Sequence, residues 1–371
     1  MRHCIFAMGT RAQLIKMAPV IRLASELRLE HSVWLSGQHS ASIEDLIKDF
    51  DLHAAIAQPI RLKERSTVGT LLVWLPGALR GCYRYVREVT GRTGRSPLLV
   101  VHGDTLSTLV SAVAGRLGGA DIVHLESGLT SGAMLDPFPE ELLRRMTFRL
   151  TKFAICPSEA AERQMAKYSC RDSVNTIENT LLDCVRYALS DEAVPAEYGG
   201  YFVVSIHRVS NIFSRARLAA ISQEVVQLSE LGRVHFVLHP PTERRLAAAG
   251  LLETLHNAPR VCLQPRTTYS RFIRLLAGSR AVLSDGGSNQ EELSYLGVPT
   301  ILYRSRSERP DGIGSNIVFR NAIPGELIDF VASGRLDRLR APARHLNDVE
   351  PSRIAVLALR GWSLIPAEAG E

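Results

Sequence analysis

The sequence lacks paired cysteines and any long uninterrupted hydrophobic run. Its six cysteines, none of them in a Cys-x-x-Cys pair, are Cys4, Cys82, Cys156, Cys170, Cys184 and Cys262. Such scattered thiols argue against a disulfide framework and a cysteine-based zinc site, and they predict a protein of the reducing cytoplasm. The most apolar stretch, residues 68–86, is interrupted by Pro76 and Arg80. It is too short between charges to cross a bilayer, so we expect a buried helix and no membrane association.

Aromatic residues are also few, at 6% of the chain, and they do not alternate with basic residues in any stretch. The net charge is +6, and the arginines are only mildly concentrated between residues 304 and 344. Binding to single-stranded nucleic acid typically combines a basic groove with stacking aromatics, so no nucleic-acid partner is expected. A mildly basic chain of this kind suits an acidic small molecule.

The common glycine motifs for nucleotides are missing as well. The first strand–helix turn, residues 8–13, has one glycine and no Gly-x-Gly-x-x-Gly, which disfavours a nicotinamide cofactor. No Gly-x-x-x-x-Gly-Lys-Ser/Thr occurs. Residues 104–107 form no Asp-x-Asp pair, and no cluster of His, Cys and Asp has metal-ligand spacing. We therefore expect neither a metal nor an organic cofactor.

Short apolar runs alternate with stretches of helical period along most of the chain. The expected strands are 3–8, 31–37, 98–104, 121–127 and 153–158, then 201–207, 234–240, 260–264, 281–287 and 299–304. The expected helices are 14–28, 41–50, 68–92, 106–117 and 139–151, then 215–231, 243–256, 268–278, 289–296 and 325–333. Continuous apolar strands joined by helices indicate parallel sheets covered on both faces, so the fold class is α/β.

The two series of strands predict two doubly wound domains. The segment 170–200 is mostly polar and ends in a stretch with proline and glycine, as expected for an inter-domain connection. We therefore expect domains over 1–175 and 176–350, with a terminal helix in 351–371. Ligands of open α/β sheets bind outside the carboxyl ends of the strands, so the expected site is a cleft between the two domains.

Polar residues collect at the ends of six expected strands. They are Arg11, Asp104, Glu126, His207, Arg208, His239 and Asp285. One such residue is usually a helix cap. Six strand ends that present polar groups in the same direction favour a shared binding cleft.

Residues 284–293, SDGGSNQEEL, are the most specific local signal. The expected strand ends at Asp285, two glycines follow, and a helix is expected to begin near Asn289. Glycines let backbone N–H groups approach a ligand, and a helix N-terminus attracts anions, so this turn favours a diphosphate. Glu291 and Glu292 are expected in the first helical turn, where one of them is placed to accept from ribose hydroxyls. A well-capped turn without a ligand is the alternative.

Two further clusters adjoin expected helix starts. Arg11 offers a planar guanidinium suited to phosphate, and Lys16 is either a second phosphate contact or a solvated lysine. Pro139 is expected in the first turn of a helix that carries Glu140 and Glu141.

Taken together, these residues resemble the UDP-N-acetylglucosamine 2-epimerase family over nearly the whole chain. The matching fragments, in the family's order, are GTRAQLIKMAPVI, HGDTLSTLVSA, HLESGLTSG, PFPEELLRR, IHRVSN, LHPP, SDGGSNQEE and SERPDG. The resemblance implies two Rossmann-like domains facing a cleft, as in B-type glycosyltransferases. It also implies that residues 352–362 form a helix returning to the first domain, and that the protein is a homodimer.

The resemblance implies conversion of UDP-GlcNAc to UDP-ManNAc by elimination of UDP, through 2-acetamidoglucal, and its re-addition. Asp104, Glu126 and Glu140 match the family's catalytic carboxylates, and His207 joins them in the reacting site near the diphosphate. The positions that match contacts to UDP or other polar positions of the cleft are Arg11, Lys16, Arg144, His239, Gly286, Gly287, Ser288, Glu292 and Arg309. Carboxylates suit the removal and return of the C2 proton if burial or mutual proximity raises their pKa.

The sequence departs from the family at several positions. Ala12 and Gln13 replace Pro-Glu, Thr130 replaces an arginine, and Ser210 replaces a glutamate. These changes leave the substrate and the fate of the product open. The alternatives are a related UDP-sugar, a hydrolysing 2-epimerase that releases ManNAc and UDP, a B-type glycosyltransferase, and a non-catalytic nucleotide-sugar binding protein.

Overall fold

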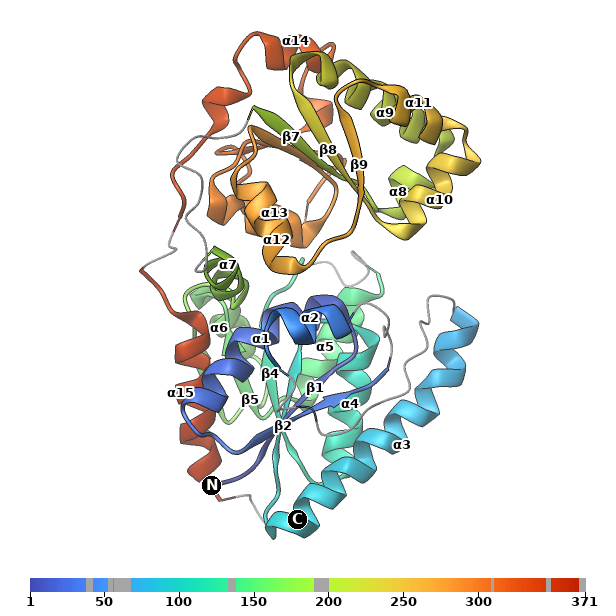
Figure 1. Cartoon of the computed structure of the whole chain (residues 1–371). Helices are drawn as coiled ribbons and strands as arrows, with labels where there is room; N and C mark the ends of the chain where they lie inside the picture. The colour runs from blue at the N-terminus through green and yellow to red at the C-terminus, as the bar shows by residue number, and fades with distance from the viewer. Residues whose placement is uncertain are drawn as a thin grey trace. The chain divides into compact units, whose positions relative to one another are not determined.

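The chain forms two compact units. The computed structural model describes residues 1–37, 43–52, 56, 68–132, 138–189, 200–307, 310–344 and 348–366. The first unit comprises Met1–Cys184 and Asn347–Glu371, and the second comprises Val185–Leu346. Each unit holds one six-stranded parallel sheet (Figure 1).

The sheet of the first unit has the strand order β2-β1-β3-β4-β5-β6. Its strands are β1 (Cys4–Met8), β2 (His31–Leu35), β3 (Leu98–His102), β4 (Asp121–Leu125), β5 (Phe153–Cys156) and β6 (Asp172–Asn175). Every residue of β1, β3, β4 and β5 is buried, which explains why these strands are mostly apolar in sequence. The strand order reverses between β1 and β3, so the carboxyl ends of these two strands flank the switch point where ligands bind in such sheets.

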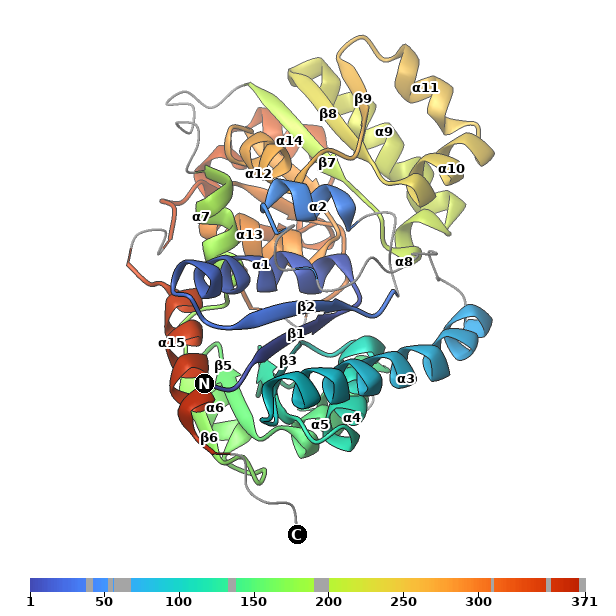
Figure 2. The ribbon, with the colours of Figure 1, turned by 60° about the horizontal axis from the view of Figure 1, so that its bottom comes forward.

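Helices cover both faces of this sheet. They are α1 (Arg11–Glu26), α2 (Glu44–Asp49), α3 (Val68–Thr93), α4 (Leu106–Leu117), α5 (Glu140–Leu150), α6 (Glu159–Met165) and α15 (Pro351–Leu364). Helix α7 (Leu181–Leu189) begins in the first unit and continues into the second. Figure 2 shows α1 on one face, with α3, α4 and α5 on the other. The long helix α3 is amphipathic rather than buried all round, because Val73 is 82% exposed while Trp74 is 3% exposed.

The segment expected to be an inter-domain connection contains two elements. β6 is the sixth strand of the first sheet, α7 follows it, and the division between the two units falls inside this segment, after Cys184. β6 is an edge strand whose residues are exposed or half-buried. A half-buried edge strand needs no apolar run, which is why its sequence gave no strand signal.

The C-terminal helix α15 packs on the first unit, beside α1. Trp362 stacks on Phe153 with ring centroids 4.9 Å apart, and its indole N–H donates to Asp172 at 2.7 Å. The backbone N–H of Arg2 donates to the carbonyl of Ser363 at 2.9 Å. Among the described residues, no helix is long and apolar enough to span a membrane.

The sheet of the second unit has the order β12-β11-β10-β7-β8-β9. Its strands are β7 (Tyr201–Ser205), β8 (Arg233–Leu238), β9 (Val261–Pro265), β10 (Ala281–Ser284), β11 (Thr300–Leu302) and β12 (Ile317–Phe319). This is the dinucleotide-fold order, and its switch point lies between β7 and β10. The three-residue edge strand β12 was not expected from the sequence.

The helices of the second unit are α8 (Val209–Ile212), α9 (Arg215–Leu231), α10 (Pro240–Ala248), α11 (Leu251–Asn257), α12 (Tyr269–Ala277), α13 (Gly287–Leu296) and α14 (Leu327–Ala332). The single helix expected over 243–256 is therefore two helices. Gly250 separates them with a φ of 72°, a left-handed conformation that glycine adopts without steric cost.

Candidate functional site

The turn after β1 is fixed by one buried glutamine. Gln13 is 2% exposed, and its amide oxygen accepts from the backbone N–H of Gly9 at 2.8 Å and of Thr10 at 3.0 Å. Its amide nitrogen donates to the carbonyl of His102 at 2.9 Å and to Thr108 Oγ1 at 2.8 Å. Gln13 thereby joins the β1–α1 turn to the β3–α4 turn across the switch point. The motif search singled it out only as a departure from the family.

Arg11 is the first residue of α1, three residues earlier than the expected helix start. Its Nη1 lies 2.9 Å and 2.8 Å from the two carboxylate oxygens of Asp45 in α2. The guanidinium thus has a negatively charged neighbour in this structure. A diphosphate that binds to Arg11 must share it with Asp45.

Lys16 and Glu126 form a buried ion pair. Lys16 Nζ lies 2.8 Å from Glu126 Oε2, and the two side chains are only 4% and 8% exposed. His102 Nε2 lies 2.9 Å from the same oxygen. Lys16 is therefore not a solvated lysine; its charge compensates a carboxylate that would otherwise be costly to bury.

Glu126 also has an unusual backbone. Its φ is +63°, in the left-handed region that non-glycine residues rarely occupy. Such conformations cost about 1–3 kcal/mol and cluster at functional sites. Because Arg28, Asp51 and Ile177 also have a positive φ, this conformation supports a functional role for Glu126 only together with its buried ion pair to Lys16.

His124 links the loops that carry the two carboxylates Asp104 and Glu126. Its Nε2 lies 2.8 Å from the carbonyl oxygen of Gly103, so Nε2 carries the proton, and Nδ1 accepts from Ser127 Oγ at 3.0 Å. Burial lowers the pKa of His124 to about 4, so the ring is neutral near pH 7. Sequence reasoning missed His124 because a histidine inside a strand carries no motif of its own.

Asp104 and Arg144 are brought together from different elements. Asp104 follows β3, Arg144 lies in α5, and Arg144 Nη2 donates to Asp104 Oδ2. Arg144 Nη1 donates to Glu141 Oε2 at 2.7 Å. Arg144 is therefore the bridge between a half-exposed carboxylate, Asp104, and a fully buried one, Glu141.

Glu140 and Glu141 occupy the first turn of α5 as expected, although Pro139 is the N-cap rather than a helical residue. Glu140 is half-buried, and its side chain forms no hydrogen bond or ion pair with any residue that the structure describes. Glu141 is 0% exposed and accepts from several donors. The buried carboxylate of this pair is thus the one that the motif reading did not select.

In the second unit, Asp285 forms a different kind of cluster. It is 0% exposed and accepts from the backbone N–H groups of His207 at 3.0 Å and Arg208 at 2.9 Å. The side-chain amide of Asn211 donates to it at 2.8 Å. Asp285 is completely enclosed, so it positions the β7–α8 turn rather than contacting a ligand.

His207 and His239 stack on one another above Asp285. Their ring centroids are 4.5 Å apart, and His207 Nδ1 lies 3.4 Å from Asp285 Oδ1. Burial lowers the pKa of His207, Arg208 and Arg266 act in the same direction, and Asp285 only partly opposes them. His207 is therefore neutral near pH 7 and serves as a hydrogen-bonding group rather than a fixed cation.

The glycine turn follows β10 directly. Helix α13 begins at Gly287, with Gly286 as its N-cap and no side-chain cap. Gly287 and Ser288 are thus helical residues. Glu291 and Glu292 lie beyond the first turn, so their expected position in that turn is wrong, and Glu292 is 2% exposed. A Cβ on Gly286 would lie 3.0 Å from His207 Cε1, so a larger residue here would displace the His207 ring slightly.

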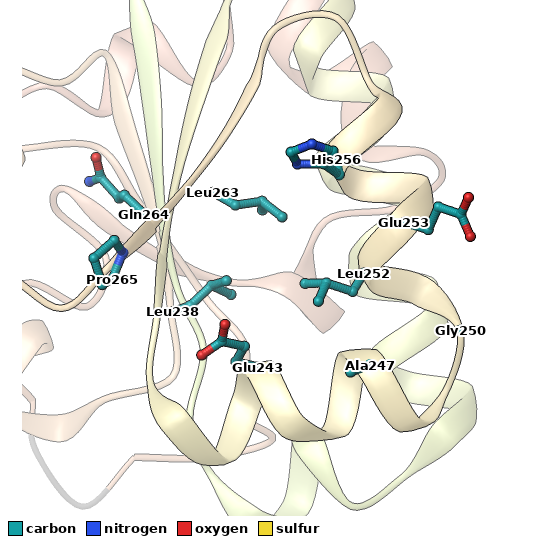
Figure 3. Close-up of a pocket in the computed structure, with 10 residues that line it drawn as sticks. All are labelled: Leu238, Glu243, Ala247, Gly250, Leu252, Glu253, His256, Leu263, Gln264 and Pro265. Atoms are coloured by element: carbon teal, nitrogen blue, oxygen red, sulfur yellow. The ribbon is translucent and has the colours of Figure 1, made fainter.

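The predicted residue Arg309 lies outside the described residues. A cavity of about 760 Å³ lies between β8, β9, α10 and α11, where Figure 3 shows Leu252 and Leu263 pointing toward one another. None of the predicted site residues lines it. Among the described residues, no group of three or more His, Cys, Asp and Glu could hold a metal ion.

Comparison with known proteins gives one consistent family. A family profile described as UDP-N-acetylglucosamine 2-epimerase matches residues 22–322. The UDP-N-acetylglucosamine 2-epimerase of Bacillus subtilis is 27% identical over 314 residues, which cover 82% of this chain and 79% of the relative. The enzyme of that name from Methanocaldococcus jannaschii is 26% identical over 326 residues, covering 84% and 86%.

Solved structures agree on the fold. The crystal structure of the UDP-GlcNAc 2-epimerase from Neisseria meningitidis bound to UDP-GlcNAc is similar to this chain, with a TM-score of 0.75 and 20% identity, covering 97% of this chain and 100% of that one. A UDP-glucosyltransferase from Polygonum tinctorium matches with a TM-score of 0.61 and 14% identity, covering 97% and 98%. These likenesses confirm the expected fold class of two Rossmann-like units, and they show that epimerases and transferases share it.

Proposed function

This chain belongs to the UDP-N-acetylglucosamine 2-epimerase family, and we propose that it converts UDP-GlcNAc, or a closely related UDP-HexNAc, to the C2 epimer without net hydrolysis. The observation that carries the proposal is the pair of carboxylates at the ends of adjacent strands, of which Asp104 is half-exposed and Glu126 is largely buried. Asp104 follows β3, Glu126 follows β4, and each lies against its own cation.

Epimerisation requires two proton transfers at one carbon. In the first half-reaction a base removes the C2 proton while the bond from C1 to the UDP oxygen breaks, which leaves 2-acetamidoglucal and UDP. In the second, the UDP oxygen bonds to C1 again and C2 receives a proton on its other face. We assign these proton transfers to Asp104, Glu126 and Glu140, three carboxyl groups carried by consecutive segments of the first unit.

The second unit supplies groups suited to the nucleotide. Gly286, Gly287 and Ser288 form the N-terminus of α13, whose backbone N–H groups and dipole attract a diphosphate. His207 and His239 stack beside the same turn. We propose that UDP stays at this turn between the two half-reactions, and that Glu292 contacts the ribose.

A deuterium experiment tests the proposal. The protein is incubated with UDP-GlcNAc in deuterated water, and C2 and the products are followed by NMR. Deuterium at C2 together with UDP-ManNAc supports the proposal. Free ManNAc and UDP would indicate the hydrolysing reaction, and transfer to an added sugar acceptor would indicate a glycosyltransferase. Tight UDP binding with none of these would indicate a binding protein.

We also propose a homodimer formed through α5. Leu142 and Met146 are four residues apart in α5, so they share one side of this helix, and they are 37% and 42% exposed. Phe138, two residues before the helix begins, is 65% exposed. Sedimentation of Leu142→Arg against the wild-type protein tests this. A monomeric variant beside a dimeric wild type supports the proposal, and a monomeric wild type contradicts it.

A further inference from the structure

Glu141 is a buried carboxylate of the first unit with several hydrogen-bond donors, and the proposed mechanism gives it no role. It is 0% exposed, and it accepts from Thr130 Oγ1 at 2.5 Å and from the backbone N–H of Ser131 at 3.3 Å. Arg144 Nη1 and Arg145 Nε donate to it at 2.7 Å and 2.9 Å. Burial raises the pKa of Glu141, but these donors outweigh burial and hold the pKa below its usual value.

The contacts of Glu141 reach the segments of all three proposed catalytic carboxylates. Thr130 and Ser131 belong to the loop that begins at Glu126. Glu140 precedes Glu141 directly in α5. Asp104 is reached through Arg144, whose other terminal nitrogen donates to its carboxylate. The α5 helix start, the β4–α5 loop and the β3–α4 turn therefore meet at this one carboxylate.

Arg144 connects Glu141 to Asp104, so Glu141 can affect the position of the cation beside Asp104. A guanidinium is planar and rigid, so fixing Nη1 on a buried carboxylate also fixes the direction in which Nη2 points. Without Glu141, the long arginine side chain would regain several rotamers, and Asp104 would lose a cation held at a set position. Positional errors of about 1 Å can cost on the order of 100-fold in rate.

We propose that Glu141 is a positioning residue that sets Arg144 against Asp104. The inference rests on the proposed function, because it matters only if Asp104 takes part in the reaction. Glu141 does not itself contact substrate. It acts through Arg144, and its own charge is balanced by Arg144 and Arg145 together.

The Glu141→Gln variant tests this, because an amide keeps the shape but turns one acceptor into a donor facing other donors. We expect kcat for C2 exchange to fall roughly 10- to 100-fold while KM changes less than about threefold. The matched control is Glu159→Gln. Glu159 is also a glutamate in the first turn of a helix with an arginine four residues later, but it is exposed. This control is expected to keep wild-type kcat.

A double-mutant cycle separates positioning from a general structural role. If Glu141 acts through Arg144, the Glu141→Gln/Arg144→Gln double variant loses no more activity than Arg144→Gln alone. Losses that multiply in the double variant would overturn the proposal, as would a Glu141→Gln kcat within twofold of wild type.

A further variant covers the case in which Glu141→Gln does not fold. Arg144→Lys keeps the charge but cannot span two carboxylates, so the same loss in kcat is expected, and wild-type kcat in this variant would overturn the bridge. Failure of the proposed function is distinguishable, since the wild-type protein would then either catalyse no exchange at C2 or release free ManNAc and UDP.

Discussion

Each unit has its own parallel sheet with a switch point, but the carboxylates near the two switch points have different partners. In the first unit, Glu126 lies against Lys16 and Asp104 lies against Arg144, so charges balance charges. In the second unit, Asp285 is balanced mainly by N–H donors from the residues around it.

The difference indicates a division of labour. The side chain of Asp104 is 29% exposed and is accessible to a substrate, whereas Asp285 is fully enclosed. A carboxylate caged by backbone donors is fixed in place and fixes its surroundings. A carboxylate against a cation at the rim of a sheet remains available for proton transfer. This difference fits the proposal that the first unit carries out the proton transfers and the second holds the nucleotide.

The largest effect is expected from Glu126→Gln, which tests whether the first unit carries out the chemistry. Removing the carboxylate removes a proposed proton-transfer group, so kcat for C2 exchange is expected to fall on the order of 10²- to 10⁴-fold. UDP affinity, measured by calorimetry, should stay near the wild-type value because the proposed UDP contacts, the turn at Gly286 and Glu292, lie in the second unit. Glu88→Gln, an exposed glutamate of α3, is the control. Wild-type exchange in Glu126→Gln would remove Glu126 from the mechanism.

The next effect is the loss of stability at acid pH that protonation of His124 in the first unit causes. The pKa of His124 is about 4 in the folded protein and about 6.5 when unfolded, so the unfolded chain binds more protons between these values. Stability is therefore complete above pH 6.5 and is lost as pH falls toward 4, by up to about 3 kcal/mol from this one group.

Urea unfolding at pH 7 and pH 5 measures this loss. The His124→Gln variant should show a smaller difference between the two pH values than the wild type does. His256→Asn, at an exposed position of α11, should keep the wild-type difference. If His124→Gln keeps the full difference, another group causes the acid sensitivity.

A smaller effect is expected from Asp285→Asn in the second unit. The amide would present a donor to backbone N–H groups, which costs about 1–3 kcal/mol of stability. UDP affinity should also fall, because His207 and the β7–α8 turn lose their anchor. Asp337→Asn breaks a more exposed ion pair with Arg280 and should cost at most about 1 kcal/mol. If Asp285→Asn lowers kcat but not UDP affinity, the proposed division of labour is contradicted.

The smallest effect is expected from Gly286→Ala. The new methyl group would press on His207 and Asn289, which must shift by a few tenths of an ångström. UDP affinity is expected to fall a few-fold, at a cost of about 1 kcal/mol. The control, Gly91→Ala at an open position of α3, should stabilise the fold by about 0.5–1 kcal/mol. Unchanged UDP affinity in Gly286→Ala would place the diphosphate elsewhere.

Local sequence determined the fold class and most elements of this protein. Apolar runs mark strands such as β1 and β3 because buried parallel strands contact helices on both faces. The same signal is absent from the edge strand β6, which is only partly buried and so needs no apolar run. The edge strand β12 is apolar, but its three residues are too few to be recognised as a strand. The strand-end positions of Asp104, Glu126 and His207 could likewise be placed from the sequence, while their roles stay predictions.

Only the tertiary structure decided which side chains meet. Lys16 and Glu126 are 110 residues apart in the sequence, and Arg144 and Asp104 are 40 apart. Periodicity and capping act over a few residues, so they cannot reveal such pairs. The order of strands in the sheet brings these side chains together, and burial then makes their pairing necessary, since an isolated charge inside the protein is too costly to leave uncompensated.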